Sequence, residues 1–220
     1  MPRPASYDET TRDALLRAAG RILAEEGATA LTMRRLASEV AATTSAIYAL
    51  FGSKEEVLRA MYREGFDGLA SHLDRVAVAD PVKRIRALAA AYRRAAHERP
   101  HLYQVMFACP VPEFVPSEED EEVGRSTLMT LREAVVTALR AKAIRGDADT
   151  ITVGLWAIIH GLTSLELAGS LAKETDPDAV WTAMVNATLT GLRPAPPRPA
   201  PPSAAPPSAA PPRPASAQPR

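Results

Sequence analysis

The sequence has little of what marks secreted, membrane-bound or catalytic chains. Its 220 residues include one cysteine, Cys109, so no intramolecular disulfide is possible and a reducing compartment suits the chain. Cys109 has no basic neighbour in the sequence, which favours an inert thiol. The first ten residues, MPRPASYDET, have no apolar segment of the kind found in signal peptides, and no run of about 18 apolar residues occurs. We therefore expect a cytoplasmic protein that does not span a membrane.

Net charge and catalytic motifs are also missing. The chain has 26 Lys and Arg against 26 Asp and Glu, which excludes a nucleic-acid binder of uniformly positive charge but leaves local basic patches open. No Gly-x-Ser-x-Gly, paired-carboxylate or Cys/His arrangement occurs among its four histidines. His97 and His101 have a metal-ligand spacing, but Pro100 interrupts their helix. We expect no enzymatic activity, no metal and no cofactor.

What is present is helical periodicity, because apolar residues recur every three or four positions and no alternating strand pattern appears. The pattern predicts an all-α fold of about nine helices. Their expected ranges are 10–26, 33–40, 43–51, 54–76, 81–99, 101–107, 123–144, 148–171 and 177–192.

Proline placement divides the chain into three parts. Residues 9–69 form a compact helical unit, and 81–193 form a longer-helix bundle that Pro81 opens. Residues 194–220 hold 12 prolines and no acidic residue, which predicts a disordered Pro/Ala-rich tail. The tail is either a solvated appendage or a weak contact to DNA phosphates or to an aromatic groove.

The stretch TTSAIYALFGSK, residues 43–54, has one charged residue in twelve. At 100° per residue, Ile47, Leu50 and Phe51 share one helix face with Ala46, whereas Thr44, Ser45, Tyr48 and Ala49 share the other. A solvent-facing helix surface usually carries Glu, Lys or Gln, and this one carries none. Two short helices in succession have helix-turn-helix proportions, in which the second helix enters the DNA major groove.

Charge and hydrogen-bonding groups for phosphate flank this small neutral face. Arg34 and Arg35 begin the preceding helix and Lys54 begins the following one. Singly, each could be a solvated charge, and Tyr48 a half-buried core residue; their joint pattern favours DNA contact. The predicted DNA-binding residues are Thr32, Arg34, Arg35, Thr43, Thr44, Ser45, Tyr48 and Lys54.

The segment LTMRRLASEVAATTSAIYALFGSKEEVL, residues 31–58, resembles the helix-turn-helix DNA-binding domain of TetR/AcrR transcriptional regulators. Thr32, Arg34, Leu36 and Ala37 match the first part of the family pattern, and Ile47, Tyr48, Phe51, Lys54 and Glu55 match the second. The sequence departs from the pattern at Leu50, often His or Tyr, and at Ser45, often Gly. The resemblance implies a two-fold dimer on a near-palindromic double-stranded DNA site and a C-terminal domain that binds a small molecule.

The stretch TVGLWAIIHGLTSLELAG, residues 152–169, carries one charged residue, Glu166, so it needs burial on most sides. Together with the last helix it predicts an isologous dimer interface. The expected interface residues are Leu155, Ile159, Leu162, Leu165, Trp181, Met184, Val185 and Leu189. Trp156, His160 and Gly161 also resemble the WHG type of TetR C-terminal domain.

Aromatic and methionine side chains of the bundle are candidates for a ligand pocket or for plain core. The pocket candidates are Tyr92, Tyr103, Met106, Phe107, Met129, Trp156 and His160. The resulting hypothesis is a DNA-binding repressor that an unknown small-molecule effector releases from DNA. The alternatives are a helical protein-interaction module without DNA binding and an enzyme that uses the helical pocket.

Overall fold

The computed structural model describes residues 9–108 and 114–194, and every regular element within them is an α-helix, which confirms the all-α prediction. Nine helices lie in these ranges. They are α1 (Glu9–Glu25), α2 (Met33–Glu39), α3 (Thr44–Phe51), α4 (Lys54–Asp74), α5 (Pro81–Glu98), α6 (Pro100–Ala108), α7 (Glu118–Arg140), α8 (Ala148–Leu167) and α9 (Pro177–Gly191). The predicted tail lies almost wholly outside the described residues, as does Cys109.

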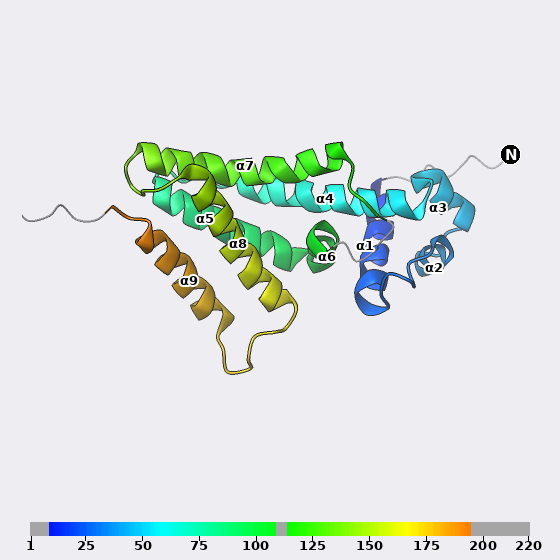
Figure 1. Cartoon of the computed structure of the whole chain (residues 1–220). Coiled ribbons are helices and arrows are strands. Elements are labelled where there is room, and N and C mark those ends of the chain that lie inside the picture. Colours follow the sequence, from blue (N-terminus) through cyan, green and yellow to red (C-terminus); the bar gives the residue numbers. More distant parts are fainter. Residues whose placement is uncertain (1–8, 109–113, 195–220) are drawn as a thin grey trace, which may run out of the picture.

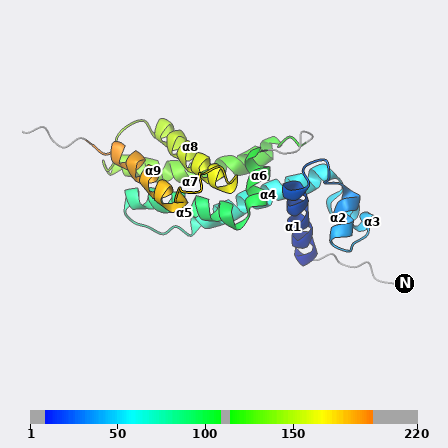
Figure 2. The same ribbon diagram turned by 90° about the horizontal axis from the view of Figure 1, so that it is seen from below.

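The molecule is elongated, with α1, α2 and α3 gathered at one end and the bundle at the other (Figures 1 and 2). Helix α4 leaves the three-helix unit and runs along the bundle, where it packs against α5, α6 and α7. Helices α8 and α9 cover the side of α5 and project away from α4. One continuous helix therefore belongs to both units.

Hydroxyl side chains cap the two short helices α2 and α3. The backbone N–H of Arg35 donates to Thr32 Oγ1 (3.1 Å), and that of Ala46 donates to Thr43 Oγ1 (3.2 Å). Ser53 caps α4 in the same way, and the carboxylate of Glu56 accepts a hydrogen bond from the Arg59 guanidinium.

The prediction for α7 was wrong at its start, because the helix begins at Glu118 rather than near Val123. Ser117 and Asp120 form a complete capping box, and four acidic residues fill the first turn. These acids stabilise the positive end of the helix dipole, so they belong to the helix and not to the preceding loop. The helix also ends earlier than expected, at Arg140, and Lys142 adopts a positive φ of 55°.

Helix α8 is apolar and 20 residues long, so it passes a length-and-composition test for a membrane-spanning helix, unlike the other described helices. Its buried side packs against α5, α7 and α9. The side chain of its one charged residue past the first turn, Glu166, is 5% exposed and pairs with Arg93 of α5 (2.8 Å). Helix α8 is therefore packed as a bundle helix, with one of its faces exposed at the surface.

A buried carboxylate joins α4 to α7. Asp120 is 0% exposed and accepts hydrogen bonds from Arg59 Nε (3.0 Å) and Arg63 Nε (2.6 Å), as well as from the backbone N–H and hydroxyl of Ser117. Burial alone would raise the pKa of Asp120, but the hydrogen bonds from Ser117 and both guanidiniums outweigh it and hold the pKa at about 2. The carboxylate is therefore charged and fully bonded.

Replacing this carboxylate tests how firmly it holds the two helices together. We expect Asp120→Asn to lower the free energy of unfolding by about 2 kcal/mol, because the buried negative charge and one of its two acceptor oxygens are lost while both guanidiniums stay partly solvated. The contribution is complete above about pH 4 and is lost as the pH falls toward 2, since the folded-state pKa lies below the ordinary 3.8. Urea titrations at pH 7 and pH 3 measure both effects. The exposed pair Arg132–Asp149 provides the control, and Asp149→Asn should leave unfolding close to wild type.

Candidate DNA-binding and ligand-binding sites

Helix α3 has the two faces that its sequence predicts. Ile47 is fully buried and Phe51 is 9% exposed, whereas Tyr48 is 51% exposed. Ser45 is exposed and Thr44 is half-buried at the start of the same outward face. Leu50 is half-buried and packs against the core, so it does not belong to that face. The outward surface is small, neutral and hydroxyl-bearing.

The two arginines of α2 differ in their availability. Arg35 donates to Glu26 (2.6 Å) and to Glu39 (2.5 Å), and these hydrogen bonds raise the pKa of its guanidinium. Arg34 is exposed and forms no ion pair with any described residue. The structure therefore commits Arg35 to holding α1 and α2 together and leaves Arg34 available to an anion.

Lys54 lies at the first position of α4, as predicted, but its ammonium group already has one partner. Its Nζ donates to the backbone oxygen of Ala28 at 3.0 Å, which joins α4 to the loop after α1. An ammonium group has three N–H donors, so two remain for a phosphate. The hydroxyl of Thr43 caps α3, and the hydroxyl of Thr32 caps α2.

An apolar cavity of about 350 Å³ lies in the bundle between α4, α5, α6, α7 and α8. Four predicted pocket residues line it: Tyr92, Met106, Phe107 and Trp156. The prediction for Met129 was wrong, because this side chain is 45% exposed on the outer side of α7. The volume is typical of a small-molecule site, for which about 300–1,000 Å³ is usual.

Tyr103 and His160, the other two predicted pocket residues, form a polar cluster behind the cavity wall. The hydroxyls of Tyr92 and Tyr103 lie 3.1 and 2.8 Å from Nδ1 of His160, and Ser164 Oγ lies 3.2 Å from the Tyr103 hydroxyl. Burial lowers the pKa of His160 and raises the pKa of both tyrosines. All of these groups are therefore neutral, and Nδ1 can accept a tyrosine hydrogen bond.

Residues of α4 and α7 that sequence reasoning missed complete the apolar cavity. They include Tyr62, Phe66, Leu69, Gly124, Leu128 and Leu131. Their spacing of three and four residues is that of an ordinary core face, so no local signal separated them from core. The ring of Phe66 packs edge-on against that of the predicted residue Phe107, with 5.6 Å between the ring centroids.

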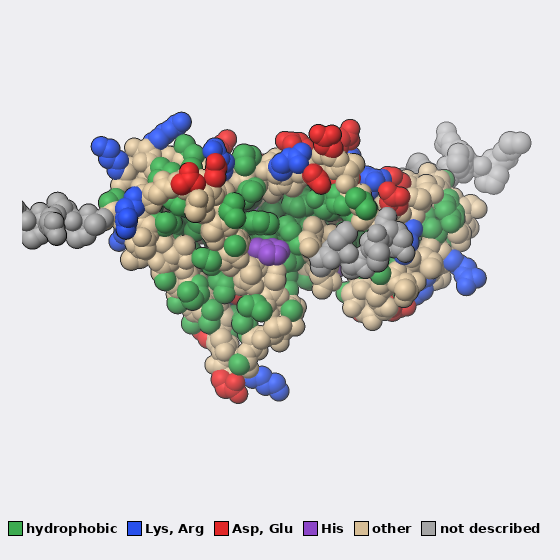
Figure 3. Space-filling view, viewed as in Figure 1, with side chains coloured by type: hydrophobic (Ala, Val, Ile, Leu, Met, Phe, Trp, Pro, Cys, Tyr) green, Lys and Arg blue, Asp and Glu red, His purple; other side chains and the backbone are tan. Residues whose placement is uncertain are grey.

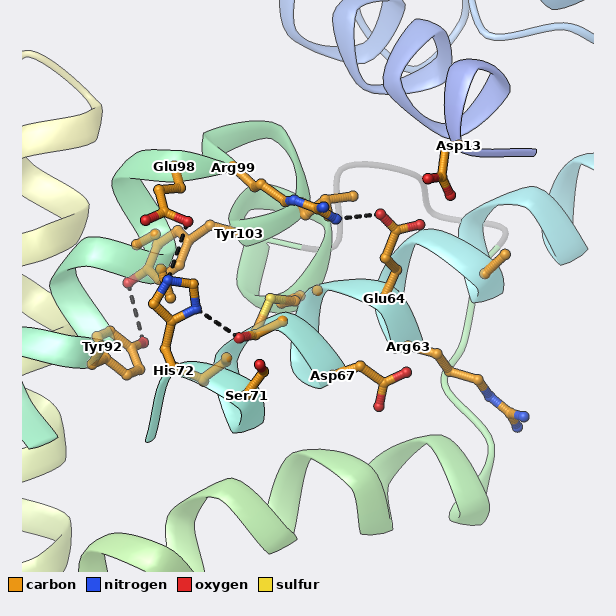
Figure 4. A pocket seen from close by; sticks show the side chains of 18 of the residues that line it. Asp13, Arg63, Glu64, Asp67, Ser71, His72, Tyr92, Glu98, Arg99 and Tyr103 are labelled. Carbon is orange, nitrogen blue, oxygen red and sulfur yellow. Dashed lines mark hydrogen bonds and ion pairs between the residues drawn. The ribbon is translucent and has the colours of Figure 1, made fainter. Parts of the chain in front are cut away.

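A second, polar cavity of about 630 Å³ is lined by three predicted pocket residues, Tyr92, Tyr103 and Met106, but its charged residues were not predicted. It lies between α1, α4, α5 and α6, and charged residues from α1, α4 and α5 and from Arg99, between α5 and α6, line it. Figure 4 shows Asp13, Glu64, Asp67, His72 and Arg99 around this space. The residues come from four distant segments, so the sequence carries no local pattern that would reveal it.

The predicted dimer interface separates into two groups. Five of its residues are buried inside their own chain and are corrected to core: Leu155, Ile159, Trp181, Val185 and Leu189. Leu165 and Met184 are 45% and 43% exposed, and Leu162 is half-buried. The exposed residues lie on α8 and α9, so these helices do present an apolar outer surface.

Comparison with known proteins identifies the family. A model of the bacterial regulatory proteins of the tetR family matches residues 15–61, and one of the tetracyclin repressor-like C-terminal domain matches residues 85–188. The HTH-type transcriptional regulator BetI of Rhizobium meliloti is 30% identical over 169 residues, which cover 74% of this chain and 80% of BetI. The chain belongs to the TetR family. It is a DNA-binding transcriptional regulator.

Further relatives of this TetR-family regulator agree with that assignment. An uncharacterized HTH-type transcriptional regulator of Mycobacterium tuberculosis is 27% identical over 194 residues, covering 87% of this chain and 84% of the relative. A solved structure of a protein with unknown function from Rhodococcus sp. RHA1 is 28% identical, with a TM-score of 0.72 over 87% of this chain and 99% of that one. PfmR from Thermus thermophilus shares the fold, at 20% identity and a TM-score of 0.70 over 81% and 98%.

The two histidines with metal-like spacing have other contacts in this TetR-family chain. His97 Nε2 lies 2.7 Å from the Glu166 carboxylate of α8. The ring of His101 lies against Gly20 of α1, where a Cβ on the glycine would be 2.1 Å from the ring. They sit in different helices, and each is held by a different neighbour.

Arg34 and Arg35 provide a matched pair for testing which cation contacts DNA. On a duplex of random sequence, Arg34→Ala should weaken binding and lower the dependence of log K on log salt by about one, because one phosphate contact is lost. Arg35→Ala should leave that slope unchanged and lower the Tm, because Glu26 and Glu39 lose their shared partner. Fluorescence anisotropy between about 50 and 200 mM salt measures the slopes. Equal slope changes in both variants would show that Arg35 leaves its carboxylates to bind phosphate.

Proposed function

We propose that this regulator is a homodimeric repressor that a small-molecule effector releases from a near-palindromic DNA site. The observation that carries the release mechanism is the position of α6. One side of this helix contacts α1 of the three-helix unit, and the other side lines the apolar cavity. A molecule that fills the cavity therefore pushes on an element that touches the DNA-binding unit.

Close packing makes the α6 contact stiff. His101 lies against the backbone of α1 at Gly20, and Met106 lies against the backbone of α4 at Gly65, where an added Cβ would be 2.5 Å from the sulfur. Glycine at both positions lets α6 approach the two helices without side chains between them. A shift of α6 is thereby passed to α1 and α4, and the separation of two α3 helices in a dimer changes with it.

The outer side of α8 and α9 supports dimerisation. Gly154 and Gly161 lie inside α8, where glycine costs about 1 kcal/mol relative to alanine, yet a Cβ at either position would meet only open space. Ala157 between them is exposed, as is Ala183 of α9. Figure 3 shows apolar side chains over the projecting α8–α9 part, with charges gathered mainly at the upper edge and the tip. Small residues on an apolar face let helices of a second copy approach closely.

Catalysis in the pocket has little support from the geometry. Ser164 Oγ lies 3.5 Å from His160 Nε2, but both residues sit on one helix, and the other ring nitrogen faces two tyrosine hydroxyls rather than a carboxylate. Membership of a regulator family implies a protein that is not an enzyme. We place its activity in the cytoplasm, where bacterial DNA is accessible to it.

Selection of bound sequences from random DNA tests the DNA-reading part of the proposal. We expect an inverted repeat, with half-sites spaced by about one helical turn. Thr44→Ala should change the base preference of the half-site, because its hydroxyl lies on the outward face of α3, whereas Tyr48→Ala should weaken binding to all sequences alike. Selection of no shared sequence by the wild-type chain would contradict the proposal.

Ala157→Arg tests the dimer surface. The added charge should block close approach of a second copy, so that sedimentation equilibrium finds a monomer and affinity for the inverted repeat falls to that of a half-site. Met129→Arg places the same charge at an exposed site on α7 and serves as the control, with dimerisation retained. A dimer in the Ala157→Arg variant would remove α8 from the interface.

A further inference from the structure

The polar and the apolar cavity meet. Leu69 of α4, Tyr92 of α5 and Met106 of α6 line both of them. We propose that the two cavities form one composite site for an amphipathic amine, with the apolar body in the apolar cavity and the ammonium group in the polar one. This inference rests on the proposed function, because it names the chemical class of the effector.

Met106 is the partition between the two cavities. Its sulfur and Cγ lie where a side chain on residue 65 would begin, at 2.5 and 2.7 Å from an added Cβ, so Gly65 makes room for the thioether. Methionine is unbranched and has three flexible torsions, and it adapts its shape more readily than leucine or isoleucine. A side chain of this kind can turn aside and join the two spaces without a movement of the backbone.

Unpaired carboxylate oxygens line the polar cavity. Glu64 Oε1 accepts a hydrogen bond from Arg99, but Oε2 is buried and has no hydrogen-bond partner among the described residues. Asp13 of α1 and Asp67 of α4 also line the space and form no ion pair with a described residue. In Figure 4 these three carboxylates lie around the same part of the cavity. A buried acceptor without a donor indicates a group that is bound there in use.

The cations that line the same cavity have partners. Most of them are held by neighbouring side chains, and this lowers their availability to a ligand. The contacts are Arg63 with Asp120, Arg99 with Glu64, His72 with Glu98, Arg75 with Ser71 and Arg12 with the ring of Phe51. Arg12 and Arg75 keep N–H donors free, but the buried group of the cavity that lacks a partner is an acceptor, Glu64 Oε2, and this favours an ammonium group over a carboxylate.

A series of three probes with one chain length tests the inference. Calorimetry at pH 7 with decylamine, decanol and decanoate should rank the amine first, about tenfold tighter than the alcohol, with the acid weakest. Decylamine carries a full charge at this pH, as a lysine side chain does. Equal affinities for amine and alcohol, or tightest binding of the acid, would overturn the proposal.

Two variants assign the ammonium contact to Glu64. Glu64→Gln should lower the affinity for decylamine about tenfold and leave that for decanol unchanged, and unchanged decanol binding also shows that the variant is folded. Arg99→Met frees both oxygens of Glu64, so decylamine should bind at least as tightly as in wild type. Loss of decylamine binding in Arg99→Met, or no loss in Glu64→Gln, would contradict the assignment.

Met106→Phe tests the connection between the cavities. A rigid ring in place of the thioether should remove the preference for decylamine over decanol, while Met106→Leu should reduce it less. A full preference in Met106→Phe would show that the ammonium group does not pass this residue.

Measuring DNA release alongside ligand binding distinguishes failure of the composite site from failure of the proposed ligand-controlled repression. If decanol and decylamine bind equally and both release the selected DNA, ligand-controlled repression stands and the composite site fails. If decylamine binds with the predicted preference and DNA affinity at fixed salt stays constant, the composite site stands and ligand release fails.

Discussion

The buried carboxylate of Asp120 is the contact on which the arrangement of the two units depends. It receives both guanidiniums that α4 presents one turn apart, at the point where α4 leaves the three-helix unit. Residues of both α4 and α7 line the apolar cavity, and this ion cluster joins the two helices near one of their ends. Arg63 also lines the polar cavity, so the cluster borders that space directly. Separation of α4 from α7 would leave the buried carboxylate with Ser117 as its remaining partner, and such a loss is costly.

Helix α6 completes this arrangement from the other side. It is nine residues long and follows a break at Pro100, so its position depends on tertiary contacts more than on its own helical stability. Those contacts are close ones, at Gly20 and Gly65, and they join α6 to α1 and α4. The Asp120 cluster and α6 both contact α4, so in the proposed mechanism α4 is the element that couples the cavity to the DNA-binding unit.

Sequence reasoning succeeded where the information is local and failed where it is tertiary. The two faces of α3 follow from nine consecutive residues, and the structure confirms them. The role of Arg35 does not follow from its neighbours alone, because Glu26 reaches it from the turn after α1. Met129 has the composition of a pocket residue, yet only the rotation of α7 against α4 decides that it faces outward. The start of α7 was open to prediction from Ser117 and Asp120, whose capping spacing the acidic run obscured.

The balance of charge explains why dimerisation and DNA reading must act together in the proposed mechanism. Within residues 1–63 there are 9 Lys and Arg and 8 Asp and Glu, a net charge of 9 − 8 = +1, and the structure engages Arg35 and Arg59 in ion pairs. One three-helix unit thus offers few free cations, and its counterion-release contribution to DNA affinity is small. Two units joined through α8 and α9 double the phosphate contacts and make the second half-site contact intramolecular. Because each unit alone binds weakly, a modest change in the separation of the two units is enough to lose contact with the second half-site. In the proposed mechanism, a ligand bound beside the far end of α4 can therefore control the affinity of the dimer for DNA.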